Sequence, residues 1–377
     1  MGYLIFFWLF YPIWWGWGKI KGVLFPTRTS KKLVFATAKL GDYFNQSVIF
    51  EKVGRFEIVV SDGIAPLAEI DPRIEKVWRL GEVKRHKLKF FLHLLSTPYR
   101  EVFVLVPNSF NLFSAQLAGG VKRTFSHYNQ KWYEKGLMVE MEKVVHTLSD
   151  LTVQTYLKLV GENDYQTNWK LVPYRSPSLP HLSSSNRFKI GISVAAGNRL
   201  KLIPAWVWDR LIPILERYPA EYHLFGVKGE ERFAAPFLEK GLKNRVVNWI
   251  GKVDLPELPA YLSQLDLYIS ADSGNSYIAD QFRVPILLFA GPCSWQEQRP
   301  LGERVKIVPS SAPCAPFSLI FKIPPYPTSP CGDPFEMEEE EWQEVEKFIS
   351  QTYKWASAPT RYPIPFRKGK ILKIDAE

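Results

Sequence analysis

The stretch that decides the fold runs from Leu267 to Asp280 and reads Leu-Tyr-Ile-Ser-Ala-Asp-Ser-Gly-Asn-Ser-Tyr-Ile-Ala-Asp. An apolar run of the kind that forms a buried strand leads into a carboxylate, a hydroxyl and a glycine, and a helical pattern follows. This order places Asp272, Ser273 and Gly274 at the carboxyl end of a strand. In a doubly wound α/β sheet, ligands bind at such ends, and the next helix offers N–H groups and its positive dipole end to a phosphate. The stretch therefore predicts an α/β fold that binds a diphosphate-bearing donor.

The same turn residues also serve purely structural roles, because Asp, Ser and Gly cap helices and free the backbone. The sequence that follows favours the ligand-binding interpretation. Residues 285–292 read Pro-Ile-Leu-Leu-Phe-Ala-Gly-Pro, a strand and turn, and residues 299–302 read Arg-Pro-Leu-Gly. In this order the segments resemble the signature of glycosyltransferase family 9, the ADP-heptose:lipopolysaccharide heptosyltransferases.

Two upstream segments resemble the same family in the same order. Residues 33–42 read Leu-Val-Phe-Ala-Thr-Ala-Lys-Leu-Gly-Asp and look like the family's first motif. Residues 189–201 form a strand, a glycine-bearing loop and a lysine, and they are similar to the strand that opens the family's donor domain. The resemblance implies an α/β GT-B architecture, in which two Rossmann-like domains face a central cleft.

The length of the chain suits two domains, because 377 residues with 46% hydrophobic side chains can build two cores. Within the first, we expect strands at 33–38, 56–61 and 102–107 and a helix at 132–151. A proline- and serine-rich stretch is the best linker. The predicted order is an acceptor-side domain (31–171), a linker (172–187), a nucleotide-sugar-binding domain (188–335), a closing helix (336–356) and a basic tail (357–377).

The amino terminus is uncharged and densely aromatic from Tyr3 to Trp17, and basic residues follow it directly. It lacks the charge order and the cleavage site of a secretory signal. As a helix the uncharged run would be about 22 Å long, which is short of the hydrocarbon core. We therefore expect residues 1–22 to be a membrane-associating segment that lies in the interface or anchors the chain. Burial against the protein's own core is the alternative.

The net charge of +10 limits the kinds of partner that the chain is expected to bind. The basic residues do not gather in one patch with interleaved aromatics, so the charge favours a membrane surface or a phosphorylated glycolipid over nucleic acid. The three cysteines form no Cys-x-x-Cys pair, and we expect free thiols in a reducing compartment. These features predict a location at the cytoplasmic face of the inner membrane, peripheral or N-terminally anchored.

Two residues would carry the chemistry if the resemblance holds. Asp42 matches the family's catalytic carboxylate and would take the proton of the acceptor hydroxyl. Lys201 matches its phosphate-binding lysine and would offset charge on the departing diphosphate. The alternatives are an N-cap role for Asp42 and a solvated surface position for Lys201.

The remaining matched residues would bind the donor. Glu230 matches the position that contacts the nucleoside, where a carboxylate accepts ribose hydroxyls, although the adjacent Glu231 is an alternative. Val253 falls where the family packs an apolar side chain on adenine, and a plain core position is equally compatible. The turn described first would bind the sugar hydroxyls through Asp272 and the diphosphate through Ser273 and Gly274.

One residue departs from the family pattern. Tyr277 stands three residues after the glycine, where the family commonly has histidine. A tyrosine cannot bring positive charge to a phosphate, but it can donate a hydrogen bond. The chain also has no Asp-x-Asp pair of the kind that holds a metal-bridged diphosphate, so we expect no metal and no cofactor.

These observations predict an inverting, metal-independent glycosyltransferase that moves a heptose from an ADP-sugar to a lipopolysaccharide core or related glycolipid. Its partners would be the nucleotide-sugar donor, the glycolipid acceptor and a membrane surface. One alternative is the same reaction with another nucleotide sugar or acceptor. A second alternative is a catalytically silent GT-B module that binds a nucleotide or glycan at the membrane.

Overall fold

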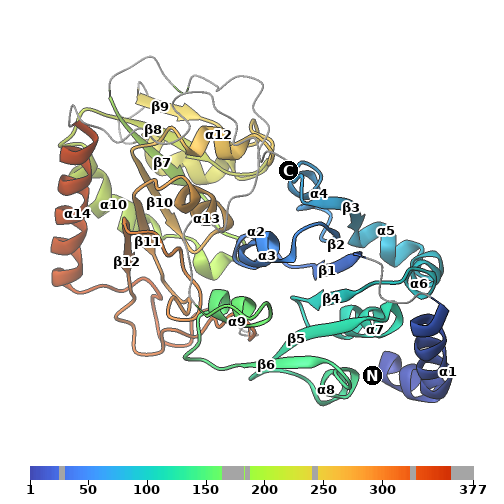
Figure 1. Ribbon diagram of the computed structural model, residues 1–377. Coiled ribbons are helices and arrows are strands. Elements are labelled where there is room, and N and C mark those ends of the chain that lie inside the picture. The colour runs from blue at the N-terminus through green and yellow to red at the C-terminus, as the bar shows by residue number, and fades with distance from the viewer. Residues whose placement is uncertain (25–29, 164–181, 183–186, 240–244, 323–327, 358–377) are drawn as a thin grey trace. The chain divides into compact units, whose positions relative to one another are not determined.

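The computed structural model describes residues 1–24, 30–163, 182, 187–239, 245–322 and 328–357. The chain divides into two compact units, Met1–Val172 and Pro173–Glu377. Each unit contains a parallel sheet with helices packed on it (Figure 1). The predicted linker (172–187) and tail (357–377) lie outside the described residues, except for Leu182, Arg187 and Ser357.

The first unit contains a sheet in the order β3-β2-β1-β4-β5-β6, all parallel. Its strands are β1 (Lys32–Ala36), β2 (Phe56–Val60), β3 (Ile74–Arg79), β4 (Glu101–Val104), β5 (Val121–His127) and β6 (Glu142–His146). Its helices are α1 (Gly2–Leu24), α2 (Leu40–Gln46), α3 (Phe50–Val53), α4 (Ala65–Ala68), α5 (Leu80–Arg85), α6 (Lys87–Ser96), α7 (Ser109–Ala118), α8 (Trp132–Leu137) and α9 (Thr152–Lys158).

The second unit repeats this plan with the order β12-β11-β10-β7-β8-β9. Its strands are β7 (Phe188–Ser193), β8 (Ala220–Phe225), β9 (Val246–Asn248), β10 (Leu267–Ala271), β11 (Ile286–Phe289) and β12 (Val305–Val308). Its helices are α10 (Ala205–Leu215), α11 (Ala235–Glu239), α12 (Leu258–Leu262), α13 (Gly274–Gln281) and α14 (Glu339–Ser357), with short 3-10 turns at η3 (Arg199–Lys201) and η4 (Glu231–Ala234).

Both sheets have the Rossmann strand order, in which the chain starts in the middle of the sheet and winds outward in both directions. The winding direction reverses between β1 and β4 in the first unit and between β7 and β10 in the second. A crevice forms outside the carboxyl ends of the strands at such a switch point, and ligands bind there. The prediction of an α/β fold with two Rossmann-like domains is confirmed.

The position of a strand in its sheet explains its sequence. The central strands β2, β10 and β11 are buried along their whole length, because helices cover both faces of a parallel sheet. The edge strands β3 and β6 carry several exposed side chains. Central strands therefore read as continuous apolar runs, and edge strands do not.

The predicted helix at 132–151 is wrong in its second half. Helix α8 ends at Leu137, Glu140 adopts a left-handed φ of 60°, and residues 142–146 form β6 beside β5. A non-glycine residue in that conformation interrupts a right-handed helix. Because β6 is an edge strand that exposes most of its side chains, its sequence lacks the apolar run that marks a central strand.

The expectation of three free thiols is also wrong. Cys314 and Cys331 form a disulfide, with Cα atoms 5.9 Å apart across 17 residues of sequence. Only Cys293 is a free, buried thiol. Pairing of this kind depends on how a loop returns in space, which the spacing of two cysteines does not encode.

The aromatic segment at residues 1–22 forms α1, and one face of it belongs to the first unit. Leu4 and Phe7 are buried in the hydrophobic core of that unit, and Tyr3 stacks on Phe113 of α7 with ring centroids 5.2 Å apart. The Tyr11 hydroxyl donates to a Glu140 carboxylate oxygen at 2.6 Å. Figure 1 shows α1 beside α7 and α8. Burial against the protein's own core therefore holds for this face of the helix.

The opposite face of α1 is exposed and apolar. It presents Ile5, Phe6, Trp8, Leu9 and Ile13 to the surface. Among the described residues, none of the helices combines the length and the apolarity needed to span a bilayer.

Shortening a side chain to alanine should cost more stability on the buried face of α1 than on its exposed face. Phe7 is 2% exposed, so Phe7→Ala should destabilise the first unit by about 3 kcal/mol, since it opens a cavity in the core. Leu9 is 70% exposed, and Leu9→Ala should change stability by no more than about 0.5 kcal/mol. Urea unfolding of the full chain, followed by circular dichroism, measures both. Equal midpoints for the two variants would mean that α1 does not pack on the first unit.

Candidate active site

Asp42 lies at the switch point of the first sheet. Strand β1 ends at Ala36, a short turn follows, and α2 begins at Leu40, so that Asp42 is in the first turn of this helix. Its side chain is half-buried. This is the edge of the sheet at which the Rossmann order creates a binding crevice, and the carboxylate is therefore placed where it can meet a ligand.

The turn that leads to this carboxylate is held by hydrogen bonds from both neighbouring strand ends. The Asn111 amide on α7 donates to the Thr37 hydroxyl at 2.7 Å and to the Val106 carbonyl at 2.9 Å. The Ser61 hydroxyl, after β2, donates to the Ala38 carbonyl at 2.9 Å. These bonds preorganise the turn. The sequence reasoning missed Asn111 and Ser61, because each acts on a backbone segment distant in sequence.

Asp272 is the centre of a cluster in the second unit. The Lys201 ammonium lies 2.7 Å from one of its carboxylate oxygens, and the Tyr277 hydroxyl donates to the other at 3.3 Å. The pair is largely sheltered, with side-chain exposures of 22% for Lys201 and 12% for Asp272. Lys201 follows β7 and Asp272 follows β10, the two strands at the switch point. The fold thus brings together residues separated by 71 positions.

The electrostatics of the cluster keep its lysine charged. Burial disfavours the ammonium, but the adjacent Asp272 carboxylate more than compensates and holds the pKa of Lys201 above its usual value. The buried Cys293 thiol also interacts with both members of the ion pair. Burial raises the pKa of Cys293, so the thiol stays neutral near pH 7. Sequence reasoning missed this cysteine, because a lone thiol carries no spacing signal.

The turn between β10 and α13 leaves hydrogen-bonding groups for a ligand. Ser273 is the N-cap of α13, yet its side chain makes no capping bond. Its hydroxyl has no partner among the residues that the structure describes. The first amides of α13 therefore lack the usual side-chain acceptor, and an anion can take that place. Diphosphate binding by Ser273 and Gly274 stays a prediction.

Glu230 folds back on its own loop after β8. One of its carboxylate oxygens accepts the Val227 amide at 2.7 Å. A Cβ at position 226 would lie 2.8 Å from that oxygen, so a larger residue there would push the Glu230 carboxylate away. Glu231 is exposed and begins the short turn η4. Of the two candidate carboxylates, the half-buried Glu230 is therefore better placed to contact a nucleoside.

Val253 lies in the turn after β9 and is half-buried. The Gly251 amide donates to the Gly226 carbonyl at 2.9 Å, which joins the carboxyl ends of β8 and β9. Glu230 and Val253 thus occupy neighbouring strand ends of one sheet edge. They stand apart from the Asp272 cluster, which gathers at the ends of β7 and β10.

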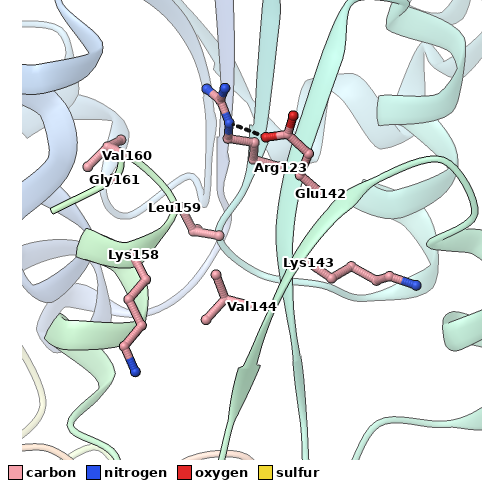
Figure 2. Close-up of a pocket in the computed structure, with 8 residues that line it drawn as sticks. All are labelled: Arg123, Glu142, Lys143, Val144, Lys158, Leu159, Val160 and Gly161. Atoms are coloured by element: carbon pink, nitrogen blue, oxygen red, sulfur yellow. Dashed lines mark hydrogen bonds and ion pairs between the residues drawn. The ribbon is translucent and has the colours of Figure 1, made fainter. Parts of the chain in front are cut away.

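A cavity of about 350 Å³ lies elsewhere, at the amino ends of β5 and β6 in the first unit (Figure 2). Arg123 and Glu142 pair with each other there at 2.7 Å, and Lys143 and Lys158 point away from the cavity. Its polar groups are therefore already satisfied or turned outward. We exclude it as the donor site, because ligands of such sheets bind at the carboxyl edge.

The sequence of the chain matches a known family. The family described as glycosyltransferase family 9 (heptosyltransferase) matches residues 109–318, which is more than half of the chain. This range includes Lys201, Glu230, Val253 and the Asp272 turn, and it begins after Asp42. A search of curated proteins returns no match.

Solved structures share the fold over most of the chain. The Escherichia coli ADP-heptose LPS heptosyltransferase II has 15% sequence identity and a TM-score of 0.65, with 87% of this chain and 100% of that chain covered. The E. coli heptosyltransferase WaaC with ADP has 16% identity and a TM-score of 0.62, with coverages of 85% and 99%. A family 9 glycosyl transferase from Veillonella parvula has 16% identity and a TM-score of 0.60, with coverages of 85% and 97%.

Proposed function

Since the chain belongs to glycosyltransferase family 9, we propose that it transfers a heptose from an ADP-sugar to a lipopolysaccharide core or related glycolipid. The observation that carries this proposal is the Lys201–Asp272 ion pair next to the open N-terminus of α13. A cation and free amides at one strand end suit a sugar diphosphate. The structures of E. coli heptosyltransferase WaaC with ADP and with ADP-2-deoxy-2-fluoro heptose support ADP as the nucleotide.

Different residues would bind different parts of the nucleotide-sugar donor. The Ser273 and Gly274 region would bind diphosphate oxygens through amides and a hydroxyl, and Lys201 would offset the charge that grows on the leaving group. Asp272 would accept hydroxyls of the heptose. Glu230 would bind the ribose with the carboxylate oxygen that Val227 leaves free, and Val253 would pack against the adenine.

The reaction would be a single displacement. The acceptor hydroxyl attacks the anomeric carbon, the bond from that carbon to the diphosphate oxygen breaks, and Asp42 takes the hydroxyl proton. One displacement inverts the anomeric centre. Lys201 and the α13 amides would stabilise the charge on the departing ADP, and we propose that the step uses no metal ion.

The acceptor side of the proposal includes a membrane surface. The exposed face of α1 and the exposed Leu88 and Leu92 of α6 are apolar, and the Phe6 and Phe91 rings both contact Phe113 between the two helices. Basic residues accompany this surface at Lys84, Arg85, Lys87 and Lys89. Apolar side chains bordered by lysine and arginine bind anionic lipid. We propose that the enzyme works at the cytoplasmic face of the inner membrane on this surface.

The role of the base is tested at Asp42. Asp42→Asn should lower turnover at least about 100-fold and leave ADP affinity nearly unchanged, since the amide cannot take a proton. Glu51→Gln removes an exposed carboxylate of α3 and serves as the control that keeps wild-type turnover. A steady-state assay of sugar transfer measures both. Normal turnover of Asp42→Asn would show that another group accepts the proton.

The donor pocket is tested by nucleotide affinity. Lys201→Ala and Glu230→Ala should each weaken ADP binding by about 1 to 3 kcal/mol, through the diphosphate and the ribose respectively. Lys347→Ala and Glu346→Ala change an exposed and a half-buried charge on α14 and should leave the affinity unchanged. Isothermal titration calorimetry gives the four values. Unaltered affinity in both pocket variants would place the nucleotide elsewhere.

The membrane surface is tested with a substitution that spares the core. Leu9→Glu puts a charge on the exposed face of α1 and should lower binding to vesicles containing anionic phospholipid about tenfold. Val145→Glu changes an equally exposed apolar residue on β6 and should leave binding unchanged. Flotation of the full chain with vesicles measures the bound fraction. Equal flotation of wild type and Leu9→Glu would reject this surface.

A further inference from the structure

The loop between β11 and β12 is fastened to α13. The Leu301 and Gly302 amides donate to the two carboxylate oxygens of Asp280 at 3.0 and 2.8 Å. A Cβ at position 302 would lie 2.2 Å from one of these oxygens, so a larger residue would force the Asp280 carboxylate to shift. Asp280 is one helical turn after Tyr277, whose hydroxyl donates to Asp272, so the loop is fastened to the helix that carries one member of the Asp272 cluster.

Arg299 precedes these two anchored amides and carries a sheltered positive charge. Its guanidinium donates to the Trp295 and Gln296 carbonyls at 3.0 and 3.2 Å and lies 5.5 Å from the centre of the Trp295 ring. Both bonds use the same nitrogen, Nη1. Within the described part of the chain, Arg299 forms no ion pair with a carboxylate. Two of its nitrogens thus have no protein partner there.

Among the described residues, no carboxylate compensates the positive charge of Arg299. Burial lowers the pKa of Arg299, and among the described residues Tyr277 opposes this effect, which places the guanidinium within electrostatic range of that side chain. Lys201, by contrast, has Asp272 as a counter-charge at 2.7 Å. A partly buried cation without an acidic neighbour is costly unless an anion joins it. The position beside α13 points to an anionic ligand.

We propose that Arg299 binds a phosphate of the donor diphosphate and supplies the positive charge that Tyr277 cannot provide. This inference rests on the proposed function. Arginine suits the task, because its planar guanidinium can give two parallel hydrogen bonds to phosphate oxygens. Tyr277 is then free to orient Asp272 through its hydroxyl, the contact seen in the structure. The positive charge that the family places at position 277 of the helix would then come from Arg299 on the neighbouring loop.

The experiment compares ADP with adenosine, which lacks the phosphates. Arg299→Gln should weaken ADP binding about tenfold or more and leave adenosine binding unchanged. Arg304→Gln is the matched control, because Arg304 is also an arginine whose pKa burial lowers, but it stacks on Trp355 of α14 at 3.8 Å. It should bind ADP like the wild type. Isothermal titration calorimetry on the full chain gives all the affinities.

The outcomes separate this inference from the proposed function. A wild type that binds ADP no better than adenosine overturns both, because no diphosphate site then exists. A wild type that prefers ADP, with an Arg299→Gln variant of the same affinity, overturns the role of Arg299 alone. If Arg299→Gln does not fold, arginine modification of the wild type by phenylglyoxal decides. ADP should protect Arg299 and not Arg304 in peptide mass spectra, and equal labelling of Arg299 with and without ADP rejects the inference.

Discussion

The candidate donor site depends on the ion pair between Lys201 and Asp272. Each residue follows one of the two strands at the switch point, and the 2.7 Å contact fixes the two strand ends to each other. A sheltered pair of this kind is worth little in net stability, because desolvation offsets the attraction. The ion pair matters because it holds its two residues in position. The carboxylate that holds the lysine is also held by Tyr277, so the start of α13 is set by three side chains from different elements.

The sequence predicted the parts of the fold that are buried on both sides. The runs at β1, β7 and β10 are apolar because helices cover both faces of the sheet, and each precedes a turn with candidate site residues. Edge strand β6 exposes most of its side chains, and its sequence therefore wrongly predicts helix. The Cys314–Cys331 disulfide was missed for a related reason, and the packing of α1 on the core was only the alternative prediction. Both depend on which surfaces meet in space.

The candidate site residues also differ in whether the sequence can predict them. Family motifs name positions, and they led to the residues that sit on strand ends, among them Lys201, Glu230 and Asp272. They carry no information about side chains that reach the site from elsewhere. Cys293 and Arg299 lie on the loop after β11, and neither forms a pattern in sequence. Only the folded loop, fastened at Asp280, brings them beside α13.

The departure at Tyr277 is best understood as a change in how the charge is distributed. A histidine at that position would present a titrating cation to the ligand, with a charge that falls away above its pKa near 6.5. Tyrosine carries no such charge, but its hydroxyl donates a hydrogen bond to Asp272. An arginine on the adjacent loop stays charged at every physiological pH. Phosphate binding that rests on arginine and lysine is therefore independent of pH in the range where a histidine would switch, and the family turn can keep its function without its usual residue.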